Sequence, residues 1–128
     1  MSSTFIPNQK GIDFVVNSPR GPVGKYIRRK AIMIKIAARA QVGVNTGALR
    51  SSIHLRHKRD IRGQYIQVGS NLPYARMHHE GTRPHVIVPN KGRALRFFVK
   101  GAVVFTHRVM HPGTRPNRYL SDQLRLVK

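Results

Sequence analysis

The four-residue motif Gly-Thr-Arg-Pro occurs twice in this chain, at Gly81–Pro84 and at Gly113–Pro116. Glycine adopts backbone angles that other residues avoid and proline interrupts regular pairing, so each copy predicts a corner of the chain. The residues between the copies include runs rich in Val, Leu and Phe, which are typical of β-strands. The motif therefore predicts corners at the two ends of one sheet, with Arg83 and Arg115 as outward cations.

Length and composition favour one ordinary domain. The chain has 128 residues, of which 40% are hydrophobic, and this is enough apolar material for a single core. It has no cysteine, which excludes disulfides and thiolate metal sites. Because no apolar run approaches the roughly 20 residues that span a bilayer, we expect no membrane-spanning segment and no interaction with a membrane.

The charge of the chain predicts an acidic partner. Lys and Arg number 24 against 4 Asp and Glu, which gives a formal net charge of +20. A compact protein with this field repels itself and attracts nucleic acid, acidic protein surfaces or other polyanions. Charge alone does not choose among these partners.

The longest regular pattern predicts an amphipathic helix from Val23 to Val42. Pro22 suits a first helical turn, Gly43 suits the end of a helix, and apolar residues recur between them every three or four positions. The other face is basic and includes Arg28, Arg29 and Lys35. That face either docks on a polyanion or is simply solvated, and the sequence leaves both interpretations open.

A hairpin is predicted directly after this helix. Ile53–Lys58 and Gln64–Val68 have the alternation of half-buried strands, and the polar residues Asp60–Gly63 favour a turn between them. Just before the hairpin, Leu49 and Ile53 are placed to face the core from a short helical turn.

The C-terminal half predicts two short helices and further strands. Pro73–His79 fits a short helix with Tyr74 and either Met77 or His78 facing inward, and Ala94–Val99 and Ala102–Val109 fit strands joined by a tight turn. A last helix would present one apolar stripe, made of Tyr119, Leu120, Leu124 and Val127.

Together these elements predict an α+β fold. We expect a mostly antiparallel sheet of four to six strands, packed with one long helix in the N-terminal half and with short helices. Residues 1–22 are expected to be an N-terminal arm or edge strand, with Ile12–Val16 extended, and residues 23–128 to be a single domain.

The residue types argue against an enzyme. Seven histidines are present, but only four acidic residues accompany them, so a metal nuclease with clustered carboxylates is not expected. No phosphate-binding loop, dinucleotide fingerprint or nucleophile elbow occurs. We expect no catalytic residue, no metal and no cofactor. Glu80 is instead expected to pair with Arg50 or Arg83 and to fasten the corner at Gly81.

An ordered series of short motifs resembles a known family. The series consists of Val44–Ile53, Val68–Asn71, Pro73–Ala75, Glu80–Thr82 and His111–Thr114. It resembles the minor tail or tail-completion proteins of long-tailed bacteriophages, which are small head-tail joining proteins of the virion neck. The residues that carry this pattern are Thr46, Gly47, Leu49, Arg50, Ile53, Gly69, Tyr74, Glu80, Gly81, Thr82, Pro112, Gly113 and Thr114.

The resemblance implies a structural, non-enzymatic virion protein with a fold related to phage tail terminators. Such a subunit is expected to assemble with itself as a ring, a hexamer, between the head connector and the tail, with DNA passing through the ring. It would reside in the virion neck or tail and in the host cytoplasm during assembly. We further expect Pro89–Phe105 to form a hairpin that reaches a neighbouring subunit or ring.

The charge gives the candidate interface residues, Arg28, Arg29, Lys35, Arg83 and Arg115. The alternative function is a basic nucleic-acid-binding protein without enzymatic activity. That reading rests on the charge of +20, although the chain contains no familiar nucleic-acid recognition module.

Overall fold

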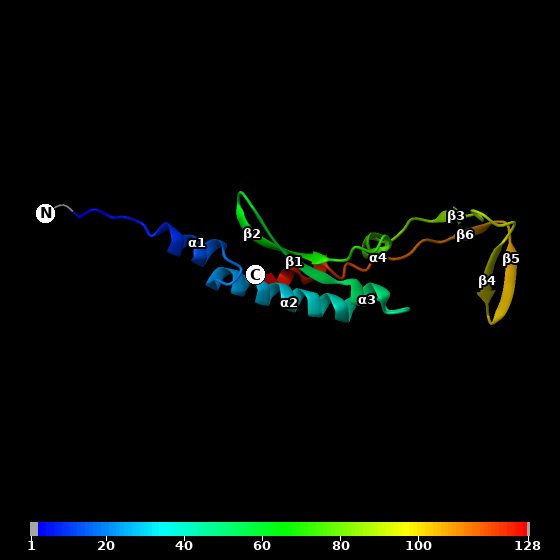
Figure 1. Cartoon of the computed structure of the whole chain (residues 1–128). Coiled ribbons are helices and arrows are strands. Elements are labelled where there is room, and N and C mark those ends of the chain that lie inside the picture. The colour runs from blue at the N-terminus through cyan, green and yellow to red at the C-terminus, as the bar shows by residue number, and fades with distance from the viewer. Residues whose placement is uncertain (1–2, 128) are drawn as a thin grey trace. The chain divides into compact units, whose positions relative to one another are not determined.

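A computed structural model describes residues 3–127 and has the α+β composition expected from the sequence (Figure 1). The elements in chain order are α1 (Gln9–Asn17), α2 (Pro22–Gln41), α3 (Ala48–Ser52), β1 (His54–Asp60), β2 (Gly63–Gly69), α4 (Ala75–Glu80), β3 (His85–Ile87), β4 (Leu95–Val99), β5 (Ala102–Thr106), β6 (Val109–His111) and the 3-10 helix η1 (Ser121–Val127). The prediction of one continuous sheet is wrong, because the strands form three separate antiparallel pairs, β1–β2, β3–β6 and β4–β5.

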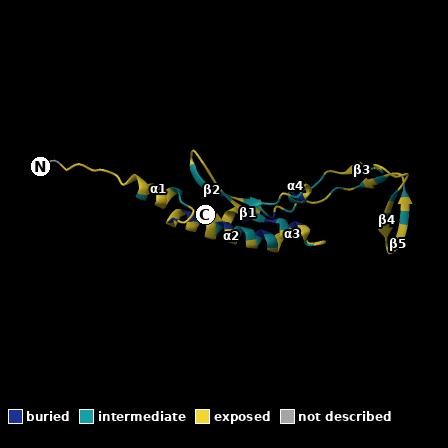
Figure 2. Ribbon diagram, in the orientation of Figure 1, coloured by how far each residue is buried: buried dark blue, intermediate teal, exposed yellow. Residues whose placement is uncertain are grey.

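The contacts within the chain divide it into two units. Residues 3–75 and 118–127 form one, here called the core unit, and residues 76–117 form the other, here called the ribbon unit. All the buried apolar side chains of the described residues belong to the core unit (Figure 2).

Helix α2 organises the core unit. Pro22 occupies its first turn, and the helix ends with the amide of Val42 donating to the carbonyl of Ala38 over 2.9 Å. The predicted apolar face is confirmed from Ile27 to Val42, since Ala31, Ala38 and Val42 are buried and Ile27 and Ile34 are half-buried. Val23, expected at the start of this face, is exposed. This face packs against β1, β2 and η1.

The N-terminal segment is helical, so the expectation of an extended Ile12–Val16 is wrong. Asn8 caps α1 by accepting from the amide of Gly11 over 3.1 Å, and Asn17 donates to Asp13 one turn earlier over 2.8 Å. The helix ends before Pro19, whose ring disfavours helical angles in Ser18. These local hydrogen bonds outweigh the strand propensity of the apolar run.

Two glycines allow α1 to turn back onto α2. A Cβ at Gly21 would collide with the carbonyl of Phe14, and one at Gly24 would collide with the carbonyl of Ser18. Both glycines are buried. The backbone therefore passes so close to the start of α2 that no side chain fits at either position.

The hairpin prediction is confirmed. Strands β1 and β2 pair in antiparallel register from His54 opposite Gly69 to Asp60 opposite Gly63. Asp60 accepts from the amide of Arg62 over 2.8 Å and so closes the turn between the strands.

The core itself is small and gathers segments that are distant in sequence. Ile53 and Tyr119 are fully buried, and the remaining buried members of the cluster are Ala38, Val42, Leu49 and Ala75. The inward placement of Leu49 and Ile53 is confirmed. Tyr119 Oη donates to the carbonyl of Ala75 over 3.3 Å and so ties the C-terminal segment to the first residue of α4.

The C-terminal elements depart from the prediction. The segment after Asn117 is a 3-10 helix, and only Tyr119 of the expected stripe is buried, because Leu120 is half-buried and Leu124 and Val127 are exposed. Tyr119 and Leu120 precede this helix, which with three residues per turn aligns residues three apart, such as Leu124 and Val127, and not residues four apart.

Helix α4 also buries a different residue from those expected to face inward. It begins at Ala75 and buries Ala75, whereas Tyr74 and Met77 are exposed and His78 is half-buried. The small alanine is the residue that fits against the ring of Tyr119, whose hydroxyl bonds to its carbonyl.

The ribbon unit consists of α4 after its first residue and of two paired ribbons. In the first, β3 pairs with β6, and in the second, β4 pairs with β5 through a tight turn at Lys100 and Gly101, both of which have positive φ. The predicted strand Ala102–Val109 is therefore two strands. Thr106 Oγ1 bonds the backbone of Arg108 and makes the turn that separates them.

Candidate assembly surfaces

In residues 3–127, no group of three or more His, Cys, Asp or Glu is arranged to hold a metal ion. No helix among residues 3–127 is long and apolar enough to cross a membrane. The candidate residues of this chain lie on surfaces, in the core and at joints between segments.

The first group of family-motif residues lies in the core unit. Leu49 and Ile53 are core residues, and Gly47 has a φ of 82° immediately before α3, where a left-handed residue is required. Thr46 Oγ1 accepts from the amide of Ala48 over 3.4 Å. These residues shape the corner between α2 and β1.

The motif residues at the edge of the core unit are accessible. Gly69 is half-buried and pairs with His54 at the end of the hairpin, whereas Arg50 and Tyr74 are exposed. None of them contributes its side chain to the core. They remain candidates for contact with a partner.

The two Gly-Thr-Arg-Pro copies pair directly with each other, so the prediction that they mark opposite ends of a sheet is wrong. Thr82 and Thr114 form an antiparallel bridge in which each amide donates to the other's carbonyl over 3.1 Å. Their hydroxyl oxygens lie 3.0 Å apart, within hydrogen-bonding distance. We call this paired arrangement the Gly-Thr clasp.

The glycines of the clasp are equivalent. Gly81 has a φ of 75° and Gly113 a φ of 85°, both in the left-handed region. A Cβ at Gly81 would lie 2.6 Å from the carbonyl oxygen of Thr114, and one at Gly113 would collide with the carbonyl of Thr82. The repeated motif therefore builds the same backbone shape on both strands of one joint, related by a local two-fold axis.

The clasp continues into the β3–β6 pair. His85 lies opposite His111, with ring centroids 5.0 Å apart, and the amide of Gly113 donates to Nδ1 of His111 over 3.0 Å. Pro112 follows His111 and is exposed. Arg83 and Arg115 are also exposed, but they flank one joint and not two ends of a sheet.

Glu80 has a different partner from the one predicted. Its Oε2 lies 3.0 Å from Nε of Arg76, one turn earlier on α4, in an exposed i,i+4 ion pair. Such pairs contribute little to stability. The expected pairing with Arg50 or Arg83 is wrong, because a partner on the same helix was available within reach.

The outward face of α2 combines charge with apolar area. Arg28 and Arg29 are exposed and Lys35 is half-buried. Beside them Ile32, Met33 and Ile36 are exposed, Ile36 by 62%. A helix that is apolar on two faces has a second surface to bury. The helical spacing of Ile32, Met33 and Ile36 is visible in the sequence and could have predicted this surface.

Not every cation of this helix is free to meet a partner. The guanidinium of Arg39 donates to the carbonyl of Ile53 over 2.8 Å and so joins α2 to the start of β1. The ammonium of Lys30 lies 5.8 Å from the ring centroid of Tyr26. Arg28, Arg29 and Lys35 are the better interface candidates.

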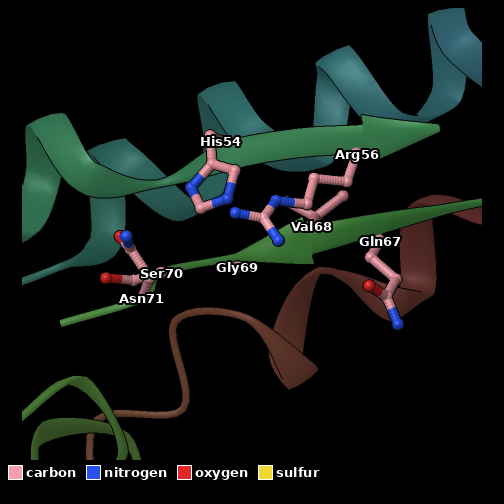
Figure 3. A pocket seen from close by; sticks show the side chains of 7 residues that line it. All are labelled: His54, Arg56, Gln67, Val68, Gly69, Ser70 and Asn71. Atoms are coloured by element: carbon pink, nitrogen blue, oxygen red, sulfur yellow. The ribbon is translucent and has the colours of Figure 1, made fainter. Parts of the chain in front are cut away.

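A depression of about 380 Å³ lies at the end of the β1–β2 hairpin (Figure 3). His54 and Arg56 project into it from β1, and Nδ1 of His54 is 2.8 Å from the carbonyl oxygen of Ser52. The other lining residues are Gln67, Val68, Gly69, Ser70 and Asn71. This lining offers donors to an anion but no carboxylate for acid-base chemistry.

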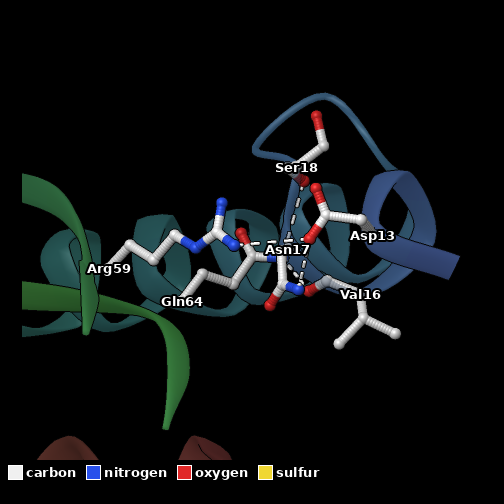
Figure 4. A network of polar contacts seen from close by, with 6 residues as sticks. All are labelled: Asp13, Val16, Asn17, Ser18, Arg59 and Gln64. Carbon is white, nitrogen blue, oxygen red and sulfur yellow. Dashed lines mark hydrogen bonds and ion pairs between the residues drawn. The ribbon is translucent and has the colours of Figure 1, made fainter. Parts of the chain in front are cut away.

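A polar network attaches α1 to the β1–β2 hairpin (Figure 4). Asp13 pairs with the guanidinium of Arg59 over 3.3 Å, and Gln64 donates to the carbonyl of Val16 over 2.5 Å. Helix α1 therefore meets the β1–β2 hairpin through polar contacts. Of Gln9–Asn17, all of which the structure describes, no residue is buried.

Burial raises the pKa of the Tyr119 hydroxyl above its ordinary value of 10.0, because the phenolate would lose its hydration in the core. The neutral hydroxyl instead donates to the carbonyl of Ala75. Ionisation of the Tyr119 hydroxyl would therefore change the stability of the core, and nothing about this group indicates a reactive site.

Comparisons with models of known protein families, with curated proteins and with solved structures found no match to this chain.

Proposed function

We propose that this protein is a structural subunit of a bacteriophage neck or tail, which assembles as a ring that joins the head connector to the tail. The proposal rests on the ordered motif series from Val44 to Thr114 and on the surfaces that this chain leaves uncovered. The fold would then be a relative of the tail terminators. The chain would act by binding copies of itself and neighbouring virion proteins.

One observation carries the proposal. None of residues 76–117, all described by the structure, is buried (Figure 2). The large apolar residues Phe98, Phe105 and Met110 are among those that are exposed. Two-stranded ribbons without a covered face are marginally stable in water. A segment of this kind is expected in a subunit whose folding is completed by assembly.

The charge distribution supports the same proposal. Between Glu80 and Asp122 the chain has no acidic residue. Exposed cations beside apolar residues, such as Arg28 and Arg29 beside Ile32, suit an acidic protein partner better than bare phosphates, because phosphates would not cover the apolar area. We expect the neighbouring ring to present acidic residues to α2.

The proposal is tested with purified protein by negative-stain microscopy and by DNA titration at two salt concentrations. Discrete rings with weak DNA affinity at physiological salt are expected. Monomers that bind DNA with a steep salt dependence would favour the alternative, a basic nucleic-acid-binding protein.

The α2 surface is tested by the triple variant Arg28→Ser, Arg29→Ser and Lys35→Ser. We expect normal folding and self-assembly but a loss of infectious titre when the variant replaces the wild-type subunit in the phage. The matched control removes three exposed cations elsewhere, Lys58, Arg62 and Arg125, and so changes the net charge equally. Equal titres for both triple variants would contradict a specific role for this face.

A further inference from the structure

The β4–β5 hairpin is apolar on both of its faces. In its register Phe98 lies opposite Val103 and Arg96 opposite Phe105, so these four residues share one face. Phe98 and Phe105 are exposed by 68% and 67%. A hairpin that is apolar on both sides has the composition of a strand pair buried between two layers, and so at least this face requires cover.

A second uncovered apolar surface lies at the N-terminus. Residues before α1 and along one side of α1 line a groove of about 520 Å³, which includes Phe5, Ile6, Ile12, Val15 and Val16. Phe5 and Ile6 are exposed by 87% and 83%. We call this surface the N-terminal groove.

The orientation of α1 shows that the groove is presented outward. The polar side of the helix faces its own unit, where Asp13 meets Arg59 and the carbonyl of Val16 meets Gln64 (Figure 4). Ile12, Val15 and Val16 remain exposed by 46%, 44% and 46%. An amphipathic helix that attaches through its polar side leaves its apolar side for another molecule.

Charge distinguishes the groove from the other exposed apolar strip. The hairpin carries Arg96 and Lys100, and the strip on α2 is flanked by Arg28 and Arg29, so contact between those two surfaces would bring like charges together. Residues 3–19, by contrast, contain one base, Lys10, and one acid, Asp13. A cationic hairpin can therefore approach the N-terminal groove with less repulsion than it would meet at the apolar strip on α2.

We propose that the β4–β5 hairpin of one copy docks into the N-terminal groove of the next copy, with Phe98 and Phe105 as the inserted side chains. This inference rests on the proposed function, because it supplies the contact between neighbouring subunits of the ring. The two surfaces differ, so each copy donates one hairpin and receives one. Head-to-tail contacts of this kind close into rings when the rotation between copies permits it.

Cross-linking is the first test, since the wild-type chain has no cysteine. Phe105→Cys and Ile12→Cys are purified as separate proteins, mixed and mildly oxidised. A disulfide-linked heterodimer is expected from this mixture. The control mixture replaces Ile12→Cys by Ile36→Cys, an exposed apolar position on α2, and is expected to cross-link at least tenfold less. Equal cross-linking in the two mixtures would overturn the assignment of the groove.

Mixing of assembly-deficient variants is the second test. One variant carries Phe98→Ser and Phe105→Ser, and the other carries Ile12→Ser and Val16→Ser. Because all four side chains are exposed, each variant should keep the thermal transition of the wild-type core unit while failing to form rings. An equimolar mixture retains one intact hairpin and one intact groove, so we expect heterodimers in mass photometry and nothing larger.

The outcomes separate this inference from the proposed function. Rings formed by either serine variant would overturn the docking scheme and leave the ring proposal standing. A cross-link within one chain carrying both cysteines, without one between chains, would show that the hairpin covers its own groove and would also overturn the scheme. If the two serine variants form heterodimers when mixed but the wild-type chain never forms rings, the head-to-tail contact stands and the ring proposal is overturned.

Discussion

The core unit and the ribbon unit differ in what holds them together, which is side-chain burial in the first and backbone pairing in the second. In the core unit Ile53 and Tyr119 are fully buried beneath α2 and the β1–β2 hairpin. In the ribbon unit, whose residues 76–117 are all described, no side chain is buried, and backbone pairing around the Gly-Thr clasp maintains the structure.

This difference separates two sources of stability. The core unit gains free energy from the removal of apolar area from water within one chain. The ribbon unit pairs its backbone but leaves Phe98 and Phe105 in water, so its apolar contribution arises only when another surface covers it. In the proposed assembly, the chain would divide its residues between those that fold the subunit and those that become ordered when subunits join.

The largest expected effect comes from the core. Ile53→Ala should lower the free energy of unfolding by about 2–5 kcal/mol, because it removes fully buried methyl groups and leaves a cavity. The measurement is denaturant unfolding followed by circular dichroism, at a concentration where the chain is monomeric.

Phe98→Ala is the matched variant in the ribbon unit. It removes a larger side chain, but one that is 68% exposed, so the monomer should unfold at the wild-type midpoint. If Phe98→Ala lowered the free energy of unfolding as much as Ile53→Ala does, the ribbon unit would have a core of its own and the contrast between the units would fail.

A smaller effect is expected at the clasp. Gly113→Ala forces a side chain into a left-handed position and against the carbonyl of Thr82, a strain of about 1–3 kcal/mol. Hydrogen exchange of the Thr82 and Thr114 amides should accelerate on the order of tenfold to a hundredfold, since a tenfold change corresponds to about 1.4 kcal/mol. The thermal transition of the core unit should not change.

Gly101→Ala provides the control for this experiment. Gly101 also has a positive φ, 84°, but a Cβ there would meet nothing within 4 Å. Its substitution should loosen the β4–β5 turn and leave exchange at Thr82 and Thr114 as in the wild type. Equal acceleration at Thr82 by both variants would show that the ribbon unit opens as a whole and that the clasp has no separate role.

Local patterns in the sequence predicted α2 and the β1–β2 hairpin of the core unit well, but not α1 or η1. The stripe that includes Ala31 and Ala38, the turn at Asp60 and the inward positions of Leu49 and Ile53 all follow from interactions within a few residues. Periodicity is informative wherever one face of an element is buried in its own chain.

The ribbon unit was predicted less well, and for a physical reason. The prediction assumed that every apolar strand joins one sheet, whereas β4 and β5 pair only with each other among the described strands. The pairing of Thr82 with Thr114 depends on a distant segment, which no local pattern reports. The repeat itself was the available signal, because identical backbone shapes suit a two-fold joint.

The smallest expected effect concerns the hydroxyl of Tyr119. Tyr119→Phe removes its hydrogen bond to the carbonyl of Ala75, and we expect a loss of about 0.5–1.5 kcal/mol of unfolding free energy near neutral pH. The ring remains in place, so no cavity forms. Tyr74→Phe, which removes an exposed hydroxyl, is the control and should have no effect at neutral pH.

The difference in unfolding free energy between the wild type and Tyr119→Phe should depend on pH, and this dependence tests whether the Tyr119 hydroxyl is buried. Burial raises the pKa of Tyr119 in the folded chain above 10.0, so above that pH the unfolded chain releases this proton first. The free energy of unfolding of the wild type therefore falls as pH rises from 10 toward the folded pKa, and it is unaffected by this group below 10. Tyr119→Phe lacks that contribution, so the advantage of the wild type should shrink in denaturant titrations between pH 9 and pH 11. A constant difference over that range would show that Tyr119 ionises as readily in the fold as in the unfolded chain, and the core unit would then be open to water where its packing is densest.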